Sequence, residues 1–153
     1  MRAIYSPVRR SKKYETTLQK LGGKDAIFPT LREALSFCAV LGYKERRRVQ
    51  FDHGAGTEDI AGAQYQLNEA VDVVFALALA DHKDSDILRP DRERDCIQIY
   101  EEYASGGLEL VQGWLDRFAD IGVEDALWRG LNSLGVRPPA SGDRPADVVA
   151  PSF

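Results

Sequence analysis

The sequence lacks the features that would place it in a membrane or outside the cell. None of its apolar runs approaches the roughly 18 residues that a membrane-spanning helix requires. Its first residues, 1–7, do not contain the apolar stretch of a secretory signal. We therefore expect a cytoplasmic protein that makes no membrane contact.

Motifs of catalysis and cofactor binding are also missing. The sequence contains no GxxxxGK[ST] phosphate loop, no GxGxxG after a strand, no GxSxG and no HExxH. Asp52 and His53 resemble a base with its orienting partner, but no nucleophile lies near them in the sequence. We therefore expect no catalytic residue and no cofactor. A cryptic metal-dependent nuclease that uses Asp52 and His53 is an alternative.

Cysteine and histidine are scarce. Cys38 and Cys96 lie far apart and outside any CxxC pair, and the two histidines have no metal-ligand spacing. Each cysteine falls on the apolar stripe of a predicted helix, where a thiol behaves as a small buried hydrophobe. The sequence thus predicts two buried cysteines and no metal site.

Helical periodicity dominates the rest of the chain. Apolar stripes predict helices over 12–21, 31–41, 67–80, 90–104, 108–118 and 124–134, with an interruption at 105–107. Thr30 and Glu33 match a capping box, and Gly42 suits the end of that helix. Residues 24–28 and 49–51 are candidate short strands. The predicted fold class is mostly α, a compact bundle of about five helices that allows a small two- or three-stranded β element near the N-terminal third.

The predicted domain organisation is simple. Residues 1–135 should form a single helical domain that begins with a basic N-terminal arm. Residues 136–153 contain four prolines and no helical stripe, which predicts a disordered, Pro-rich tail.

Charge is divided unevenly along the chain. Residues 1–50 contain twelve Lys or Arg and four Asp or Glu, whereas residues 51–153 contain eight and twenty. A basic end of this kind is common in nucleic-acid-binding proteins. It is equally compatible with a self-complementary surface, in which the basic part folds onto the acidic helices or onto a second copy. We interpret Glu101 and Glu102 as a solvated helix face between two core tyrosines.

Two basic clusters are candidates for contact with DNA. Three consecutive arginines follow the capped helix and can present several guanidinium groups to phosphate. A second cluster precedes the first helix. The predicted DNA-binding residues are Arg9, Arg10, Lys12, Lys13, Lys44, Arg46, Arg47 and Arg48.

Three stretches carry a family resemblance. They are FPTLREALSFCAVLGYK at 28–44, VDVVFALA at 71–78 and IQIYEEYASGGLE at 97–109. They resemble the small bacterial family named DNA phosphorothioation-associated, or Dnd system-associated, protein 4, over residues 8–120. The chain departs from that family in its full Glu45–Arg48 run and its long tail. The resemblance implies a system in which DNA carries sulfur in its backbone and modification-dependent restriction proteins act. It implies no chemistry for this subunit.

These observations favour a non-enzymatic accessory protein of a bacterial DNA phosphorothioation and restriction defence system. Its basic N-terminal third would contact the DNA phosphate backbone, and its acidic helices would bind another protein of the system or form a homodimer. The main alternative is a protein-interaction subunit with no DNA contact. Salt-dependent DNA binding distinguishes the two.

Overall fold

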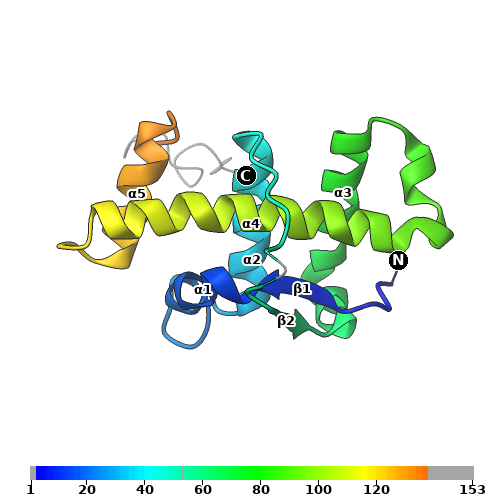
Figure 1. The fold of residues 1–153 in the computed structure, drawn as a ribbon, viewed down its shortest axis with the longest axis horizontal. Coiled ribbons are helices and arrows are strands. Elements are labelled where there is room, and N and C mark those ends of the chain that lie inside the picture. The colour runs from blue at the N-terminus through cyan, green and yellow to red at the C-terminus, as the bar shows by residue number, and fades with distance from the viewer. Residues whose placement is uncertain (1–2, 53, 138–153) are drawn as a thin grey trace, which may run out of the picture.

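A computed structural model describes residues 3–52 and 54–137, with one long helix at the centre (Figure 1). The elements in chain order are β1 (Val8–Ser11), η1 (Lys12–Tyr14), α1 (Glu15–Leu21), α2 (Leu31–Lys44), β2 (Thr57–Ile60), η2 (Gly62–Glu69), α3 (Ala70–His82), η3 (Ser85–Leu88), η4 (Pro90–Arg92), α4 (Glu93–Arg117) and α5 (Val123–Ser133). The predicted class, mostly α with a small sheet near the N-terminal third, is confirmed. Among the described helices, none combines the length with the apolar character that crossing a bilayer requires.

The central helix, α4, runs for 25 residues, and α2, α3 and α5 all cross it (Figure 1). Glu93 and Asp95 lie in its first turn, where carboxylates stabilise the positive end of the helix dipole. The predicted interruption at 105–107 is wrong, because these residues lie in the middle of the continuous helix. A Cβ atom at Gly106 or Gly107 would overlap the backbone of another segment. The two glycines therefore allow close packing and do not end the helix.

The capping threonine of α2 is confirmed. The Thr30 hydroxyl oxygen accepts a hydrogen bond from the Glu33 amide at 3.1 Å. Gly42, however, is not the helix end that the sequence predicts, because α2 continues to Lys44. A Cβ atom at Gly42 would overlap the carbonyl oxygen of Tyr103 in α4. Gly42 thus allows α2 and α4 to pack closely where they cross.

The small sheet consists of β1 and β2, which pair antiparallel with Val8 opposite Ile60. The prediction of an N-terminal arm is corrected here, since Ile4 and Val8 are buried and β1 packs against α4. The candidate strands at 24–28 and 49–51 do not form. Instead, Phe28 makes one isolated bridge with Gly22. β2 escaped prediction because three of its four residues are exposed and polar, so it lacks an alternating apolar pattern.

The apolar helix predicted at 67–80 is α3, but its start is displaced. Leu67 lies in η2 and is 54% exposed, so it does not belong to the buried stripe. Glu69, with φ of 59°, separates the two elements. A left-handed residue at this position changes the direction of the chain, and the helical periodicity begins after it.

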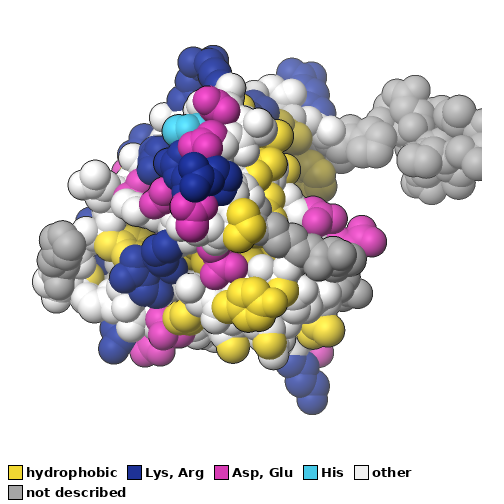
Figure 2. Space-filling view, turned by 90° about the vertical axis from the view of Figure 1, so that its right-hand side faces the viewer, with side chains coloured by type: hydrophobic (Ala, Val, Ile, Leu, Met, Phe, Trp, Pro, Cys, Tyr) yellow, Lys and Arg dark blue, Asp and Glu magenta, His cyan; other side chains and the backbone are white. Residues whose placement is uncertain are grey.

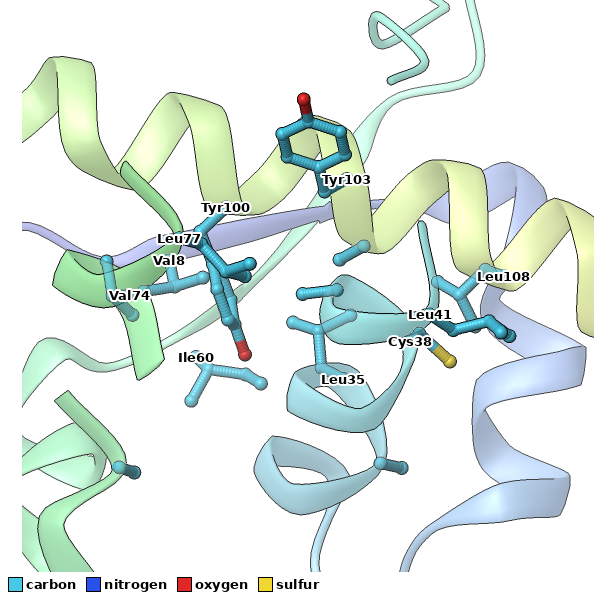
Figure 3. Close-up of a cluster of buried hydrophobic side chains, with 14 of the residues drawn as sticks. Val8, Leu35, Cys38, Leu41, Ile60, Val74, Leu77, Tyr100, Tyr103 and Leu108 are labelled. Carbon is cyan, nitrogen blue, oxygen red and sulfur yellow. The ribbon is translucent and has the colours of Figure 1, made fainter. Parts of the chain in front are cut away.

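The core joins α2, α3, α4 and both strands (Figure 3). In this close-up Leu35, Leu77 and Tyr100 lie close together, and the ring of Tyr103, which belongs to the same buried cluster, points away from them. Cys38 and Cys96 are fully buried and not in a disulfide, as the sequence predicts. Burial raises the pKa of the Cys38 thiol.

Candidate nucleic-acid interface

The eight predicted DNA-binding residues do not form one surface. Four of them lie on β1 and η1, and Lys44 ends α2. The three arginines follow α2, and the last two of them begin a segment that we call the strap (residues 47–51). Figure 1 shows this segment crossing α4 before the chain reaches β2. The strap and α2 therefore both contact the same part of α4.

Glycines allow these contacts to be close. A Cβ atom at Gly106 would overlap the carbonyl of Arg47 in the strap, and one at Gly107 would overlap the carbonyl of Cys38 in α2. The Val49 amide donates to the carbonyl of Glu102 at 3.0 Å. Packing at this distance fixes the strap, and with it the arginine side chains, against α4.

The arginines next to α4 are ion-paired with its glutamates. Arg48 Nε lies 2.6 Å from Glu102 Oε1, and its Nη1 lies 3.1 Å from Asp81 Oδ2. Arg47 pairs with Glu109, which also accepts a hydrogen bond from the Tyr14 hydroxyl at 3.0 Å. These basic side chains therefore pack onto the acidic helix. This arrangement is the self-complementary surface that the uneven division of charge along the sequence allows as an alternative to nucleic-acid binding.

Arg9 extends this pattern to the sheet. Its backbone amide donates to Glu101 Oε2 at 2.6 Å, and its guanidinium pairs with the same carboxylate. Arg94 also pairs with Glu101. On the other face of β1, Arg10 is buried and makes two hydrogen bonds to Glu15, at 2.8 and 2.9 Å. These arginines stabilise the junctions between elements.

The interpretation of Glu101 and Glu102 as a solvated face is wrong, since both side chains are buried. Burial raises the pKa of Glu101, even though Arg9 and Arg94 favour the ionised form. The pKa of Glu109 is lowered, chiefly by its hydrogen bond from Arg47. Helical spacing alone placed the glutamates between core tyrosines and gave no sign that arginines distant in sequence would cover them.

The lysines before α1 have weaker contacts. Lys12 Nζ lies 3.5 Å from Glu58, with both side chains about half exposed. Lys13 is exposed, with Nζ 5.6 Å from the centre of the Tyr14 ring. Within the described residues no ion pair of Lys13 is found. Exposed pairs of this kind contribute little to stability.

A different arrangement occurs where α2 and α3 end. A hollow of about 370 Å³ opens there, which we call the rim hollow. It is lined by Tyr43, Lys44, Arg46, Ala80, Asp81, Lys83 and Tyr103. Lys44 is ion-paired with its neighbour in the chain, since Lys44 Nζ lies 3.3 Å from Glu45 Oε2. Over residues 3–52 and 54–137, Arg46 and Lys83 make no ion pair.

The backbone contributes to this exposure. Arg46 and Lys83 have φ values of 54° and 63°, in the left-handed region that often ends a helix. The turn at Arg46 separates it from the next two arginines, which are directed to α4. The sequence predicted Lys44 and Arg46, but it missed Lys83, which lies in a loop that reads as a polar connector. Only the fold brings it to the ends of both helices.

Charges at the start of α4 are mixed rather than segregated. Figure 2 shows dark-blue and magenta side chains side by side on this end of the molecule. Arg92 pairs with Asp86 at 3.1 Å and Asp95 at 2.9 Å, and Arg89 pairs with Asp86 and Asp91. Among the described residues, this end therefore presents no extended patch of one sign.

The residues of the alternative nuclease site are only partly described. Asp52 Oδ1 accepts a hydrogen bond from the Gly54 amide at 3.0 Å and so supports a turn. His53 lies outside the described residues. Within the described ranges, no group of three or more His, Cys, Asp or Glu side chains could hold a metal ion.

Comparison with family models gives one match. The model of the family described as DNA sulphur modification system-associated protein 4 matches residues 7–128. No curated protein and no solved structure matches the chain. The matched region includes α2, the strap, α4 and the whole rim hollow.

Proposed function

Because the chain belongs to the family of DNA sulphur modification system-associated protein 4, we propose that it is a non-enzymatic accessory protein of such a system that contacts DNA phosphates at the rim hollow. The proposal places the protein in the cytoplasm, where bacterial DNA lies. Its protein partners would be other components of the system.

The observation that carries this proposal is the convergence of three exposed cations, Lys44, Arg46 and Lys83, on one hollow. A cation without a carboxylate partner can neutralise a phosphate and release its condensed counterions, which is the main source of sequence-independent DNA affinity. Arg46 and Lys83 meet this condition within the described residues.

The strap arginines suit DNA less well. If Arg48 turned to a phosphate, the largely buried carboxylate of Glu102 would lose its closest cation. Removing one partner of a buried ion pair costs several kcal/mol, of the order of 3–5. The proposal therefore narrows the sequence prediction to Lys44 and Arg46, adds Lys83, and assigns Arg9, Arg10, Arg47 and Arg48 to the folded framework.

A second candidate is the protein-interaction subunit with no DNA contact. It is favoured by exposed apolar side chains on α2 and α3, the two helices that end at the rim hollow. Val40 of α2 is 49% exposed, and Leu79 of α3 is 39% exposed. Apolar side chains flanked by cations suit an acidic protein partner as well as they suit DNA.

A salt titration separates the two candidates. The rim variant, Lys44→Gln, Arg46→Asn and Lys83→Asn, removes the cations, and asparagine tolerates the left-handed backbone at the last two positions. Wild type should bind duplex DNA with an affinity that falls steeply with salt. The rim variant should flatten the log–log slope by roughly two to three units, at about 0.9 per lost phosphate contact.

A charge-matched control uses three exposed cations outside the hollow, Lys20→Gln, Lys24→Gln and Arg129→Gln. This control should keep the wild-type slope. Absence of duplex binding by the wild type at low salt would contradict the proposal and favour the second candidate. Equal losses in both variants would mean that binding depends on net charge and not on the rim hollow.

A further inference from the structure

We propose that the rim hollow binds an unpaired nucleotide of single-stranded DNA, with the base against the ring of Tyr43 and the phosphate at the cations. This inference rests on the proposed DNA contact and specifies the form of DNA. It follows from the three kinds of chemistry that meet in the hollow, which are cations, phenol rings and a carboxylate.

The aromatic part is already held in position. The rings of Tyr43 and Tyr103 pack edge to face, with centroids 5.5 Å apart and planes at 80°. The Tyr103 hydroxyl donates to Asp81, which fixes the inner ring. The outer ring, Tyr43, is 37% exposed and lines the hollow. A fixed and exposed ring beside cations is the arrangement by which proteins stack the bases of single strands.

The carboxylate distinguishes a nucleotide from a bare phosphate. Asp81 lines the hollow and would repel a phosphate that came close to it. It already accepts hydrogen bonds from Tyr103 and Arg48, but an ionised carboxylate has about four acceptor positions. The remaining positions suit the N–H groups on the edge of a base. In a duplex these groups are paired and the faces of the base are stacked, so only an unpaired base can use both Asp81 and Tyr43.

The ends of two helices do not account for the cations. α2 ends at Lys44 and α3 at His82, and each C-terminus carries about half a negative charge. The two ends together carry about one negative charge, which is less than the two positive charges of Arg46 and Lys83, the cations of the hollow that have no ion pair in the described residues. Helix capping also gives no reason for an exposed tyrosine at this place. A volume of about 370 Å³ lies within the range of small-molecule sites.

The test compares three DNA probes with the full-length protein. They are a short single strand, the same strand with one abasic position at its centre, and a duplex of the same sequence. The variants are Tyr43→Leu, which removes the ring, and Tyr43→Phe, which keeps it. A 2-aminopurine at the central position of the single strand reports stacking through loss of its fluorescence. Thermal melting confirms that both variants remain folded.

We expect the intact single strand to bind about tenfold more tightly than the abasic strand. Tyr43→Leu should abolish this difference and the fluorescence loss, and Tyr43→Phe should retain both. Duplex affinity should not change in either variant. Equal binding of the intact and abasic strands, or no effect of Tyr43→Leu on that difference, would overturn the inference. If duplex DNA still binds at the rim hollow in that case, the proposed function remains supported. If neither single strand nor duplex binds, both are wrong.

Discussion

The middle of α4 and the rim hollow use the same kinds of side chain in opposite ways. Along α4, Arg9, Arg47 and Arg48 are paired with Glu101, Glu109 and Glu102. At the rim, Arg46 and Lys83 face solvent without an ion pair in the described part of the chain. The first set holds segments together, and the second remains available to a ligand.

The contrast is sharpest within three consecutive residues. Arg46 turns away from α4 at a left-handed backbone position, whereas Arg47 and Arg48 continue along the strap and pair with carboxylates. A run of arginines in a sequence therefore does not define a phosphate site. What matters is which of the guanidinium groups already has a carboxylate partner after folding.

The largest expected effect concerns the close packing on α4. Gly107→Ala should destabilise the protein by about 3 kcal/mol or more, because the new Cβ meets the backbone carbonyl of Cys38, which has no freedom to rotate away. Gly113→Ala on the same helix meets nothing within 4 Å and should stabilise it by about 0.5–1 kcal/mol. Chemical denaturation measures both. Similar free energies of unfolding for the two variants would show that α2 does not pack closely at Gly107.

A smaller effect should separate the adjacent arginines. Arg48→Gln leaves Glu102 without its closest cation and should cost about 2 kcal/mol of stability, since Arg48 is itself partly exposed. Arg46→Asn should change stability by less than about 0.5 kcal/mol. The same denaturation experiment measures both variants. Equal losses in the free energy of unfolding would show that Arg46 contributes to the fold as much as Arg48 does, which contradicts the distinction between the two arginines.

The smallest effect is in the titration of two glutamates on α4. The pKa of Glu101 is raised above its ordinary value of 4.5 by burial, and that of Glu109 is lowered below it by Arg47. Glu101 therefore contributes a loss of stability as pH rises above 4.5, whereas the contribution of Glu109 is present above 4.5 and lost as pH falls below it. Carbon-13 NMR of the side-chain carboxyls should show Glu101 titrating at higher pH than Glu109. The reverse order would contradict the assigned burial.

Local patterns predicted most of the helices. The capping threonine and apolar stripe of α2 and the burial of both cysteines were evident in the sequence because they depend on neighbours in the chain. β2 and the continuity of α4 through Gly106 and Gly107 were not, because they depend on segments that are distant in sequence. A glycine pair inside a helix reads as a break until the chain that packs against it is known.

The candidate site was predictable only in part. Lys44 and Arg46 stood out as basic residues after a capped helix. Lys83 joins them only because α2 and α3 end at the same place on the molecule. The burial of Glu101 and Glu102 was hidden for the same reason, since their arginine partners come from β1 and the strap.

The most direct test of the account is duplex DNA titration of Arg46→Asn and Arg48→Gln, at a temperature where both variants are folded. The account predicts that Arg46→Asn lowers DNA affinity and reduces the log–log salt slope by about one unit, while Arg48→Gln keeps wild-type affinity and slope. A loss of DNA binding in Arg48→Gln with none in Arg46→Asn would contradict it, because the strap and not the rim would then contact DNA.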